Sequence, residues 1–560
     1  MIALILFLLV AVSFGEEYLL KGELPESLKT FLKKKISEKV YLLDLPDGPL
    51  FKQSFNGNFI LEKNVKLRAL KLPNDTCFSY RWDLEAIDAP EAWDRSVGSQ
   101  EVYVAVFDTG VDYNHPDLKD NLWKNPDEVC DNGVDDDGNG YVDDCYGVNV
   151  LCYPRGYYDT NAPGCNAPDA YDDDGHGTLI AGIIGAVGNN GFLIPGVAWR
   201  VKIIPCKFLD ASGFGELEGE LACFEYIKKL ERDKGIKVIA INASYGGEYL
   251  FSRVQYEEIS NFNGVYITAS GNYGDNNDEI DFYPCNYNLD NEICVGAYDV
   301  YKKPAYFSNY GYYTVDLFAP GEEILGLYTG KHSNSCEKSL VLGAGTSLSA
   351  PFVTGAVALL YSLNRNLSPR EIKREILLTG ENSKDYDGKS YTCNLLNLNN
   401  LLSGESSQKM CLSTGELNFG TLNSGESKTL SLTVRSTGKK DLIITGLRTS
   451  NSAFKVSGKN CTLKALKPFE ECSIQITFSP VSGGTYTGEL TIQTSEGLIR
   501  SIKLYGESIP TSSDTSFNPN VPNRSKTSNG GGGGCNTETN SYFILFLLLL
   551  LKKVFKGKRA

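Results

Sequence analysis

Four short motifs, far apart in the chain, constrain its fold more strongly than any other feature. Each sets one polar residue among glycines and small residues: Tyr-Val-Ala-Val-Phe-Asp-Thr-Gly holds Asp108, Asp-Gly-His-Gly-Thr holds His176, Ala-Ser-Gly-Asn holds Asn272, and Gly-Thr-Ser-Leu-Ser-Ala-Pro holds Ser347. The order aspartate, histidine, serine along the chain differs from the two other common orders of a serine triad, so the motifs indicate one kind of fold.

These four residue types have the chemistry of a serine nucleophile and the groups that assist it. A serine hydroxyl is a poor nucleophile and needs a base that works near neutral pH, which predicts that role for His176. A buried carboxylate, here Asp108, would hold the base in one tautomer. The carbonyl that Ser347 attacks becomes an oxyanion, and the Asn272 side chain with the Ser347 backbone N–H would bind it.

The region from Trp82 to Leu402 therefore resembles the subtilisin-like serine peptidases. The resemblance implies that Asp108 orients His176, which acts first as base and then as acid. Three residues depart from the family's usual motifs, at positions that bear on packing rather than on the reaction: Leu179, Leu348 and Phe352. Of the other two histidines, we expect His115 to be structural and His332, for which the sequence indicates no partner, to lie on the surface.

Apolar runs alternate with helical segments through the same region. The sequence predicts strands at Val102–Phe107, Val201–Lys207, Val238–Ala243, Val265–Ala269 and Ile293–Val295, and helices at His176–Val187, Gly219–Arg232 and Ser349–Asn364. Fully apolar strands that alternate with helices indicate an α/β domain of three layers, in which helices cover both faces of a mostly parallel sheet. Active sites of such sheets lie at the carboxyl ends of the strands, where Asp108 and Asn272 fall.

A short segment after one predicted strand resembles the substrate-binding edge of the same family. It reads Ile-Asn-Ala-Ser-Tyr-Gly-Gly over residues 241–247, and the resemblance singles out Ser244, Tyr245 and Gly246. Backbone hydrogen bonds there would hold a peptide in extended form without regard to its side chains. The alternative is an ordinary strand end with a glycine turn.

An acidic insertion over residues 127–144 predicts a calcium site. It carries eight carboxylates and no lysine or arginine, and such a density of like charge is repulsive unless a cation binds. Oxygen donors at alternate residues and a glycine at the turn match the first part of an EF-hand-like loop, with these candidate ligands: Asp135, Asp137, Asn139, Asp143 and Asp144. The family resemblance implies a second calcium site at Asp117 and Asn189. The alternative for the insertion is an exposed acidic loop.

Cysteine content and charge limit the compartment and the partners. The chain has 15 cysteines, and a net charge of −15 argues against nucleic acid as a partner. Neighbouring cysteines predict five disulfides, which favour export: Cys130–Cys145, Cys152–Cys165, Cys206–Cys223, Cys285–Cys294 and Cys461–Cys472. Four other cysteines would pair over longer distances: Cys77, Cys336, Cys393 and Cys411. Free buried thiols are the alternative.

The composition of the amino-terminal end is typical of a signal peptide followed by a leader. Residues 1–15 are almost wholly apolar and resemble a secretory signal peptide. We expect residues 16–76 to form a leader with a lysine-rich helix over 27–39. The family resemblance implies that this leader is a propeptide, which binds the catalytic domain in cis, assists its folding and caps its active site. The catalytic domain would span residues 77–405.

The carboxyl-terminal part differs from the catalytic region in composition and in its pattern of apolar residues. Residues 411–508 show short alternating runs of threonine, serine, leucine and isoleucine, which predict an all-β sandwich, and they resemble immunoglobulin-like modules. Residues 509–540 predict a flexible linker. Residues 541–560, an apolar segment and a basic tail, resemble bacterial surface-sorting signals when taken with Cys535 and the glycines before it. A plain membrane anchor is the alternative.

The sequence as a whole predicts an exported or surface-displayed serine endopeptidase. It would hydrolyse proteins or peptides through an acyl-enzyme and would be stabilised by calcium. The alternative is a catalytically idle scaffold of the same fold that binds peptides or surface partners. The complete set of nucleophile, base, orienting carboxylate and oxyanion donor favours the enzyme.

Overall fold

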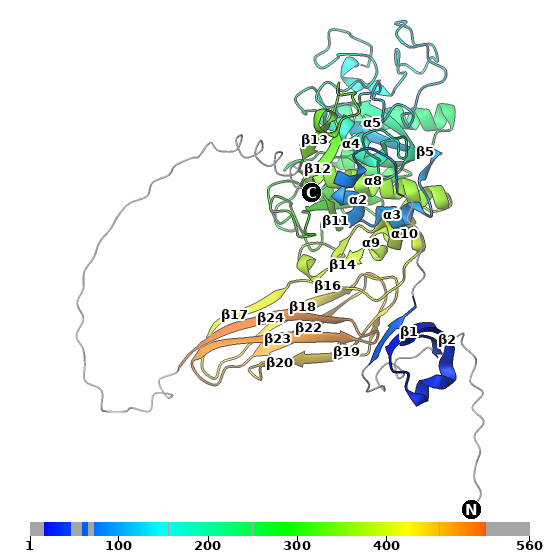
Figure 1. Ribbon diagram of the computed structural model, residues 1–560. Helices are drawn as coiled ribbons and strands as arrows, with labels where there is room; N and C mark the ends of the chain where they lie inside the picture. The colour runs from blue at the N-terminus through cyan, green and yellow to red at the C-terminus, as the bar shows by residue number, and fades with distance from the viewer. Residues whose placement is uncertain are drawn as a thin grey trace, which may run out of the picture.

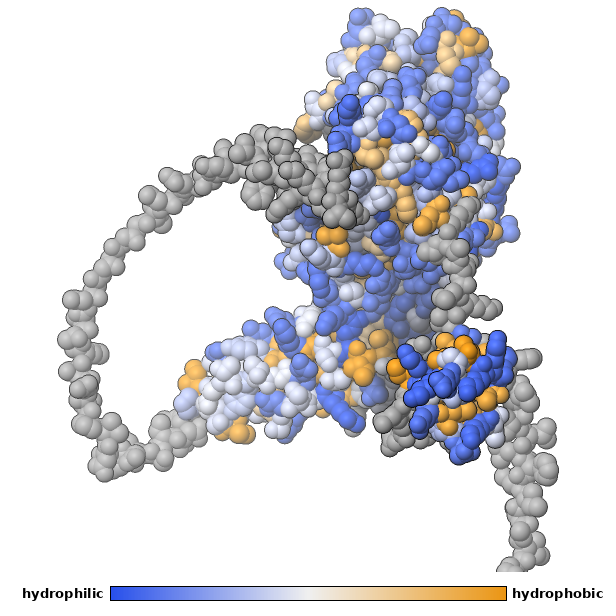
Figure 2. All heavy atoms as spheres, in the orientation of Figure 1, coloured by the Kyte–Doolittle hydropathy of each residue, from blue (hydrophilic) through white to orange (hydrophobic). Residues whose placement is uncertain are grey.

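The computed structural model describes residues 16–45, 59–64, 72–154, 156–248, 251–457 and 460–510 (Figure 1). The predicted signal peptide and nearly all of the predicted linker and tail lie outside these residues. Hydrophilic residues predominate on the face that Figure 2 shows, and hydrophobic residues form scattered patches on it. Scattered exposed apolar side chains are usual for a folded protein in water.

A nine-stranded sheet forms the centre of the α/β region. Its strands run in the order β14-β15-β11-β10-β9-β8-β5-β7-β6, and every pair is parallel except β14 with β15. The bounds are β5 Gly98–Asp108, β6 Val148–Asn149, β7 Arg200–Lys207, β8 Val238–Ala243, β9 Val265–Ala269, β10 Glu292–Tyr298, β11 Leu317–Pro320, β14 Glu381–Asn382 and β15 Asn394–Leu395. The predicted mostly parallel sheet is therefore confirmed.

Helices cover both faces of this sheet. Successive residues of β5 alternate between two cores: Val104 and Val106 pack towards α4 and α8, whereas Ala105 and Phe107 pack towards α5 and α6. The helices are α2 Trp82–Ala86, α3 Ala89–Trp93, α4 His176–Gly185, α5 Leu217–Lys234, α6 Arg253–Asn261, α7 Cys336–Ser339, α8 Thr346–Leu363, α9 Pro369–Thr379 and α10 Leu398–Ser403. Strands β12 (Ile324–Leu327) and β13 (Leu340–Gly343) form a separate antiparallel pair. The three layers explain why the strands read as continuous apolar runs.

Helix α8 is the one helix among the described residues with the length and hydropathy of a membrane span, and 83% of its most apolar window is buried within the fold. It lies against five strands of the sheet, β5, β8, β9, β10 and β11, as well as α4. Pro351 is the sixth residue of this helix and lacks the N–H that would bond the Ser347 carbonyl oxygen, which accepts instead from Ser244 Oγ at 2.7 Å. Its apolar character is therefore that of a core helix, which carries Ser347 at its second position.

Residues 410–509 form the predicted all-β sandwich. Two sheets pack face to face, one in the order β16-β18-β22-β20 and the other in the order β17-β24-β23-β19-β21. The bounds are β16 Met410–Leu412, β17 Glu416–Asn423, β18 Lys428–Ser436, β19 Leu442–Thr449, β20 Phe454–Val456, β21 Ala465–Leu466, β22 Glu471–Phe478, β23 Gly484–Thr494 and β24 Ile499–Ile509. Alternate residues of these strands enclose one apolar core. This two-sheet packing confirms the expected fold of the carboxyl-terminal region.

A small antiparallel sheet precedes the α/β region. Its order is β2-β3-β1-β4, with bounds β1 Glu16–Gly22, β2 Leu32–Ser37, β3 Val40–Leu45 and β4 Phe59–Lys63, and a 3-10 turn lies at Glu26–Phe31. The helix predicted over residues 27–39 is wrong. Lysine has only a weak preference for the helix, and pairing with β3 satisfies the backbone of β2 instead.

Within the described residues, seven disulfides link fourteen cysteines. The five predicted between neighbours are present. Of the other four cysteines, Cys77 joins Cys336 across 259 residues, and Cys393 joins Cys411 between the α/β region and the sandwich. A set of this size is typical of proteins that fold in an oxidising compartment.

Buried cations join the α/β region to the sandwich. Arg435, in β18, is 1% exposed and donates to the carbonyl oxygens of Tyr312 at 3.1 Å and Tyr391 at 2.7 Å. Its guanidinium lies 3.8 Å from the ring centroid of Tyr391. Lys409 donates to two further carbonyl oxygens of the α/β region. The two parts therefore share a polar interface in which charges are buried with partners.

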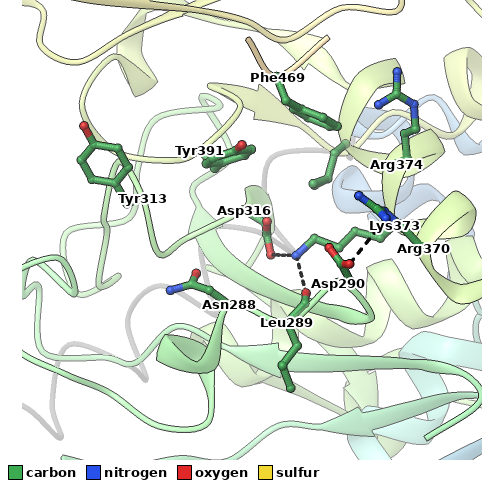
Figure 3. A pocket seen from close by; sticks show the side chains of 11 residues that line it. Asn288, Leu289, Asp290, Tyr313, Asp316, Arg370, Lys373, Arg374, Tyr391 and Phe469 are labelled. Carbon is green, nitrogen blue, oxygen red and sulfur yellow. Dashed lines mark hydrogen bonds and ion pairs between the residues drawn. The ribbon is translucent and has the colours of Figure 1, made fainter. Parts of the chain in front are cut away.

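A cavity of about 370 Å³ opens at this junction (Figure 3). Aromatic rings of Tyr391 and Phe469 face the basic side chains of α9 across it. Lys373, the innermost of these cations, binds Asp316 Oδ2 and the Leu289 carbonyl oxygen, each at 3.1 Å. The Lys373 ammonium is thus already paired within the protein.

Candidate active site

Asp108 and His176 meet at the carboxyl edge of the sheet. Asp108 is the last residue of β5 and is fully buried, and His176 is the first residue of α4. The Nδ1 atom of His176 lies 2.8 Å from Asp108 Oδ1 and 3.0 Å from Oδ2. Because Nδ1 faces a carboxylate, it carries the proton, and Nε2 is left as the atom that can accept one.

The surroundings of His176 adjust its proton affinity in two directions. Burial alone would lower the pKa of the imidazole, but the Asp108 carboxylate raises it, with further help from Asp174 and Asp172. The net effect is a pKa above the ordinary value of 6.5. His176 therefore keeps its proton to a higher pH than a free histidine side chain does, and it can act as a general base above that raised pKa.

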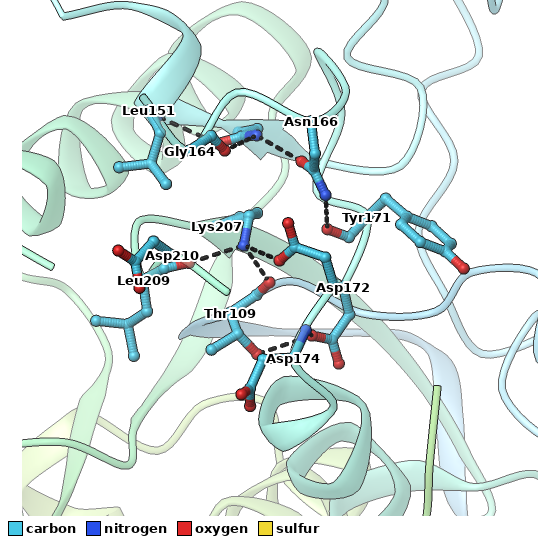
Figure 4. A network of polar contacts seen from close by, with 12 residues as sticks. Thr109, Leu151, Gly164, Asn166, Tyr171, Asp172, Asp174, Lys207, Leu209 and Asp210 are labelled. Atoms are coloured by element: carbon cyan, nitrogen blue, oxygen red, sulfur yellow. Dashed lines mark hydrogen bonds and ion pairs between the residues drawn. The ribbon is translucent and has the colours of Figure 1, made fainter. Parts of the chain in front are cut away.

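A buried polar network holds the loop before His176 against the end of β5 (Figure 4). Thr109 donates from Oγ1 to Asp172 at 2.9 Å and accepts from the Gly177 backbone N–H at 2.9 Å. The fully buried ammonium of Lys207 donates to the Thr109 carbonyl oxygen and to Asp173, each at 2.8 Å. The segment that contains Asp108 and the segment that contains His176 are thus fixed to one another by charge-assisted hydrogen bonds.

Asn272 and Ser347 approach the same point from two other elements. Asn272 follows β9, and its Oδ1 accepts from the backbone N–H of Thr346 at 2.8 Å and from Thr346 Oγ1 at 2.9 Å. This contact leaves the Nδ2 group to face the cleft. A Cβ atom placed at Gly345 would lie 3.0 Å from Ser347 Oγ and 3.6 Å from Asn272 Nδ2, so both groups border one small space. An oxyanion formed at Ser347 would fall within reach of that amide.

One cleft of about 410 Å³ contains His176, Asn272 and Ser347 together with residues 244–246. Ser244 donates from Oγ to the Ser347 carbonyl oxygen at 2.7 Å, which ties the segment to the start of α8. In the described part of the chain no hydrogen bond joins His176 to Ser347. Such contacts often tighten only when substrate binds. The structure thus brings together, with Asp108 behind His176, all seven residues that the sequence assigned to catalysis and substrate binding.

The acidic insertion is arranged differently from the predicted loop. Oxygen atoms of Glu128, Asp137 and Asp144 lie within 4.8 Å of one another. Asn139 borders this group through its amide N–H, which donates to Asp144 Oδ2 at 2.9 Å, while its Oδ1 accepts from the Tyr141 N–H at 2.7 Å. Glu128 was not predicted, and apart from its place in the insertion no sequence signal marks it.

Two of the predicted ligands do not join this group. Asp135 accepts from the backbone N–H groups of Asn139 and Gly140, and Asp143 faces away and accepts from those of residues 132 and 133. The insertion contains no basic residue of its own, but Lys234 of α5 partly neutralises its negative charge, because its ammonium lies 2.8 Å from Asp137. A local motif predicts neither the backbone N–H groups that Asp135 and Asp143 bind nor the contact with Lys234.

The second predicted site contains one more carboxylate than expected. Asp117 and Asp75 are both buried, and the backbone N–H of Asn189 donates to Asp75 Oδ2 at 2.7 Å. Burial raises the pKa of Asp117 to about 7 and that of Asp75 to about 6. The side chain that bonds Asp117 is Asn190, at 2.7 Å, rather than Asn189, whose Oδ1 accepts from the Asn74 N–H. Asp75 was missed because its only sequence signal is its position just before the catalytic region.

The remaining histidines form a pair that the sequence did not predict. His115 is fully buried as expected, with Nε2 3.1 Å from the Lys331 carbonyl oxygen. His332 lies on the surface as expected, with its side chain 40% exposed, and its Nε2 lies 2.7 Å from Asp112 Oδ2. No sequence signal marks this partner, because Asp112 lies 220 residues earlier in the chain.

Comparison with known proteins agrees with this geometry. The model of the subtilase family matches residues 99–394, and that of the HYDIN/CFA65/VesB-like Ig-like domain matches residues 408–507. The thermophilic serine proteinase of Bacillus sp. (strain AK1) is 32% identical over 340 residues, which cover 59% of this chain and 71% of that protein. The chain therefore belongs to the subtilase family and carries an immunoglobulin-like domain after the catalytic region.

Two further proteins show the extent of the similarity. Subtilisin-like protease 1 of Plasmodium berghei (strain Anka) is 29% identical over 348 residues, which cover 57% of this chain and 52% of that protein. The chain thus matches only about half the length of that relative. A solved structure of proteases from Pseudoalteromonas arctica PAMC 21717 has a TM-score of 0.47 and 25% identity, with 60% of this chain and 99% of that chain covered.

Proposed function

We propose that this protein is a serine endopeptidase that acts through Asp108, His176, Ser347 and Asn272. The observation that carries the proposal is the arrangement around one cleft. The imidazole contacts a buried carboxylate at 2.8 Å, and the hydroxyl of Ser347 borders the same space as the Asn272 amide. These positions support the assignment of each group to its part in acyl transfer.

The reaction follows from these positions. Ser347 Oγ attacks the peptide carbonyl carbon while His176 Nε2 takes the hydroxyl proton, and Asp108 stabilises the imidazolium that forms. The oxyanion is bound by Asn272 Nδ2 and the Ser347 N–H. His176 then gives its proton to the leaving amine as the C–N bond breaks, which leaves an acyl-enzyme. A water molecule, deprotonated by the same imidazole, hydrolyses this ester and restores the hydroxyl.

The substrate is a protein or peptide in extended form. Residues 244–246 line the cleft beside Ser347, and the backbone of this segment continues β8 at the edge of the site. An extended peptide that pairs with this segment would present its carbonyl to Ser347. Backbone pairing gives affinity for many sequences, so any selectivity has to come from side-chain pockets.

Hydrolysis of an unfolded protein such as casein tests the proposal. The Ser347→Ala variant should lose activity to background. The Asn272→Ala variant should lose about 10²–10³-fold in kcat, a magnitude measured on a subtilisin, a member of this family, because the acyl-enzyme route survives without one oxyanion donor. Ser347→Ala should melt at the temperature of the unmodified protein and serves as the control, whereas Asn272→Ala should stay folded but melt lower, because the buried Thr346 N–H loses its acceptor. Equal activity in Ser347→Ala would contradict the proposal.

Calcium is the proposed structural cation. Two atoms support it: Asp75 Oδ1 and Glu128 Oε2 are buried without a hydrogen-bond partner among the described residues. Burial also raises the pKa of Asp144 to about 7. Asp75 and Asp117 would hold one ion, and Glu128, Asp137 and Asp144 would hold another. The side chains of Asn189 and Asn139 would each have to turn an amide oxygen towards the ion when it binds. A bound ion would neutralise these carboxylates and fix the loops, and it takes no part in the reaction.

Export is the proposed route to the site of action, and the disulfides support it. In this layout residues 1–15 direct export, residues 16–76 assist folding as a propeptide, and residues 77–405 and 411–508 form the mature domains. The linker and the tail at 541–560 would retain the protein at the cell surface. Mass spectrometry of the mature termini tests this layout, because a chain that still begins at Met1 and ends at Ala560 would contradict it.

A further inference from the structure

The side chain that precedes the cleaved bond has a defined place in the cleft. It is carried by the residue whose carbonyl Ser347 attacks, so it starts one bond away from the reacting carbon. On one side lies the segment 244–246 and on the other the segment 269–272. We expect this side chain to enter the space between the two backbone segments, where Gly246, Ala269 and Gly271 leave room, although Tyr245 and Asn272 of the same segments also line the cleft.

The ring of Phe282 occupies that space. A Cβ atom placed at Gly246 would lie 2.5 Å from Phe282 Cε1, and one placed at Gly271 would lie 3.1 Å from Phe282 Cδ2. The ring thus touches the Cα faces of both segments and spans the gap between them. Phe282 also lines the cleft that contains Ser347, although it is only 5% exposed.

The backbone around Phe282 is held in place, so the ring is a fixed part of the cleft. Tyr283 and Gly247 exchange two backbone hydrogen bonds of 2.9 Å, which join the Phe282 loop to the substrate segment. The Phe282 N–H donates to Asn286 Oδ1 at 3.2 Å. The ring packs in a buried cluster with Cys285 and Cys294, which are joined by a disulfide. A side chain packed in this way does not move aside for a ligand without loss of these contacts.

We propose that Phe282 closes the inner end of the cleft and limits the residue before the cleaved bond to glycine, alanine or serine. The inference rests on the proposed endopeptidase activity and names its substrate class. Gly246, Ala269 and Gly271 are small, and an aromatic ring already occupies the room that they leave. A phenylalanine or leucine side chain at this position of a substrate would overlap the ring. A methyl or hydroxymethyl group would fit beside it.

Two matched peptides that differ only in the residue before the cleavage site, alanine or phenylalanine, test the inference. The unmodified protein should cleave the alanine peptide with a kcat/KM at least about 10-fold higher, the lower end of the discrimination that a hydrophobic pocket achieves. The Phe282→Ala variant should raise kcat/KM for the phenylalanine peptide by at least about 10-fold and change that for the alanine peptide much less. Phe282→Leu should give an intermediate preference and guards against misfolding of the smaller variant.

Phe251→Ala is the matched control, since Phe251 is 52% exposed, packs on Tyr283 at 6.0 Å between ring centroids and does not line the cleft. Its peptide preference should be that of the unmodified protein. Equal cleavage of both peptides by the unmodified protein, or an unchanged preference in both Phe282 variants, would overturn the inference. A fluorophosphonate label distinguishes the two proposals. Labelling of Ser347 without cleavage after small residues contradicts only the inference, whereas absence of labelling and of cleavage contradicts the enzyme itself.

Discussion

The proton affinity of His176 sets the pH range in which Ser347 can be activated. Asp108 contacts the imidazole directly, while Asp174 acts on it through charge and accepts from its backbone N–H at 3.0 Å. These negative charges stabilise the protonated ring, and so they raise its pKa despite burial. The protonated ring cannot act as a base. Asp174, which does not touch the imidazole, therefore helps to set the pH range of activity together with Asp108.

Activity should fall on the acidic side with a midpoint above pH 6.5, because the pKa of His176 is raised from that value. As the pH decreases through the raised pKa, the ring gains a proton and the fraction of enzyme in the active form decreases. Asp174→Asn removes one negative charge near the ring and should move this midpoint to lower pH. The pH profile of kcat/KM measures it. A midpoint that stays in place in Asp174→Asn would contradict the assigned role of this carboxylate.

At the scale of single elements, the loops depend on cross-links and on the proposed cation. The Cys130–Cys145 disulfide closes the acidic insertion, and closing a loop of about 15 residues contributes about 3 kcal/mol to stability in the chain-entropy model. Within that loop Asp144 is held by Asn125, Asn139 and Tyr226 at 2.8–2.9 Å. The cross-link therefore leaves the charges of the carboxylates close together, and a cation would offset their repulsion.

Removal of calcium by a chelator should lower the melting temperature by about 5–10 °C, as expected when a ligand present at about 100 times its Kd is withdrawn. Asp117→Asn should reduce this response, because it removes one ligand of the proposed site. Asp441→Asn, an exposed change in the sandwich, is the control and should keep the full response. Scanning calorimetry with and without chelator measures the shift. An unchanged melting temperature would contradict the structural role of calcium.

Some elements could be predicted from the sequence and others could not, for physical reasons. The strands of the sheet were predictable because both faces are buried, so apolar runs such as Val102–Phe107 are continuous. Asp108, His176 and Ser347 were predictable because each lies in a local motif. Glu128 was not, because the folding of the insertion decides which of its carboxylates group together. Phe282 was not, because its position depends on two other segments of the chain. Lys207 offered a signal that was not used, a lysine that ends a buried strand.

At the scale of the whole molecule, buried arginines fasten the sandwich to the α/β region. Arg435 lies between the rings of Tyr312 and Tyr391, at 4.1 Å and 3.8 Å from their centroids. Arg500 extends this contact, with its guanidinium 3.3 Å from Asp387. A buried charge with its partners in place resists separation, since pulling the two parts apart leaves these carbonyl and carboxylate groups without their donors. The two domains should therefore unfold together.

Arg435→Ala should separate the unfolding of the two domains. The change leaves the carbonyl groups of Tyr312 and Tyr391 without their donor and should cost at least about 2 kcal/mol. Calorimetry should show one transition in the unmodified protein and a separate, earlier one in Arg435→Ala. Arg448→Ala, an exposed arginine of β19, is the control and should keep one transition. A single unshifted transition in Arg435→Ala would contradict the proposed coupling.

The most direct test of the central claim is the rate at which a fluorophosphonate modifies Ser347. The reagent reacts only with a serine that a neighbouring base activates, so it reports the nucleophile and the base together. Peptide mapping by mass spectrometry should place one label on Ser347 in the unmodified protein, and His176→Ala should slow the labelling by several orders of magnitude. Labelling of a different serine, or an equal rate in His176→Ala, would contradict the account.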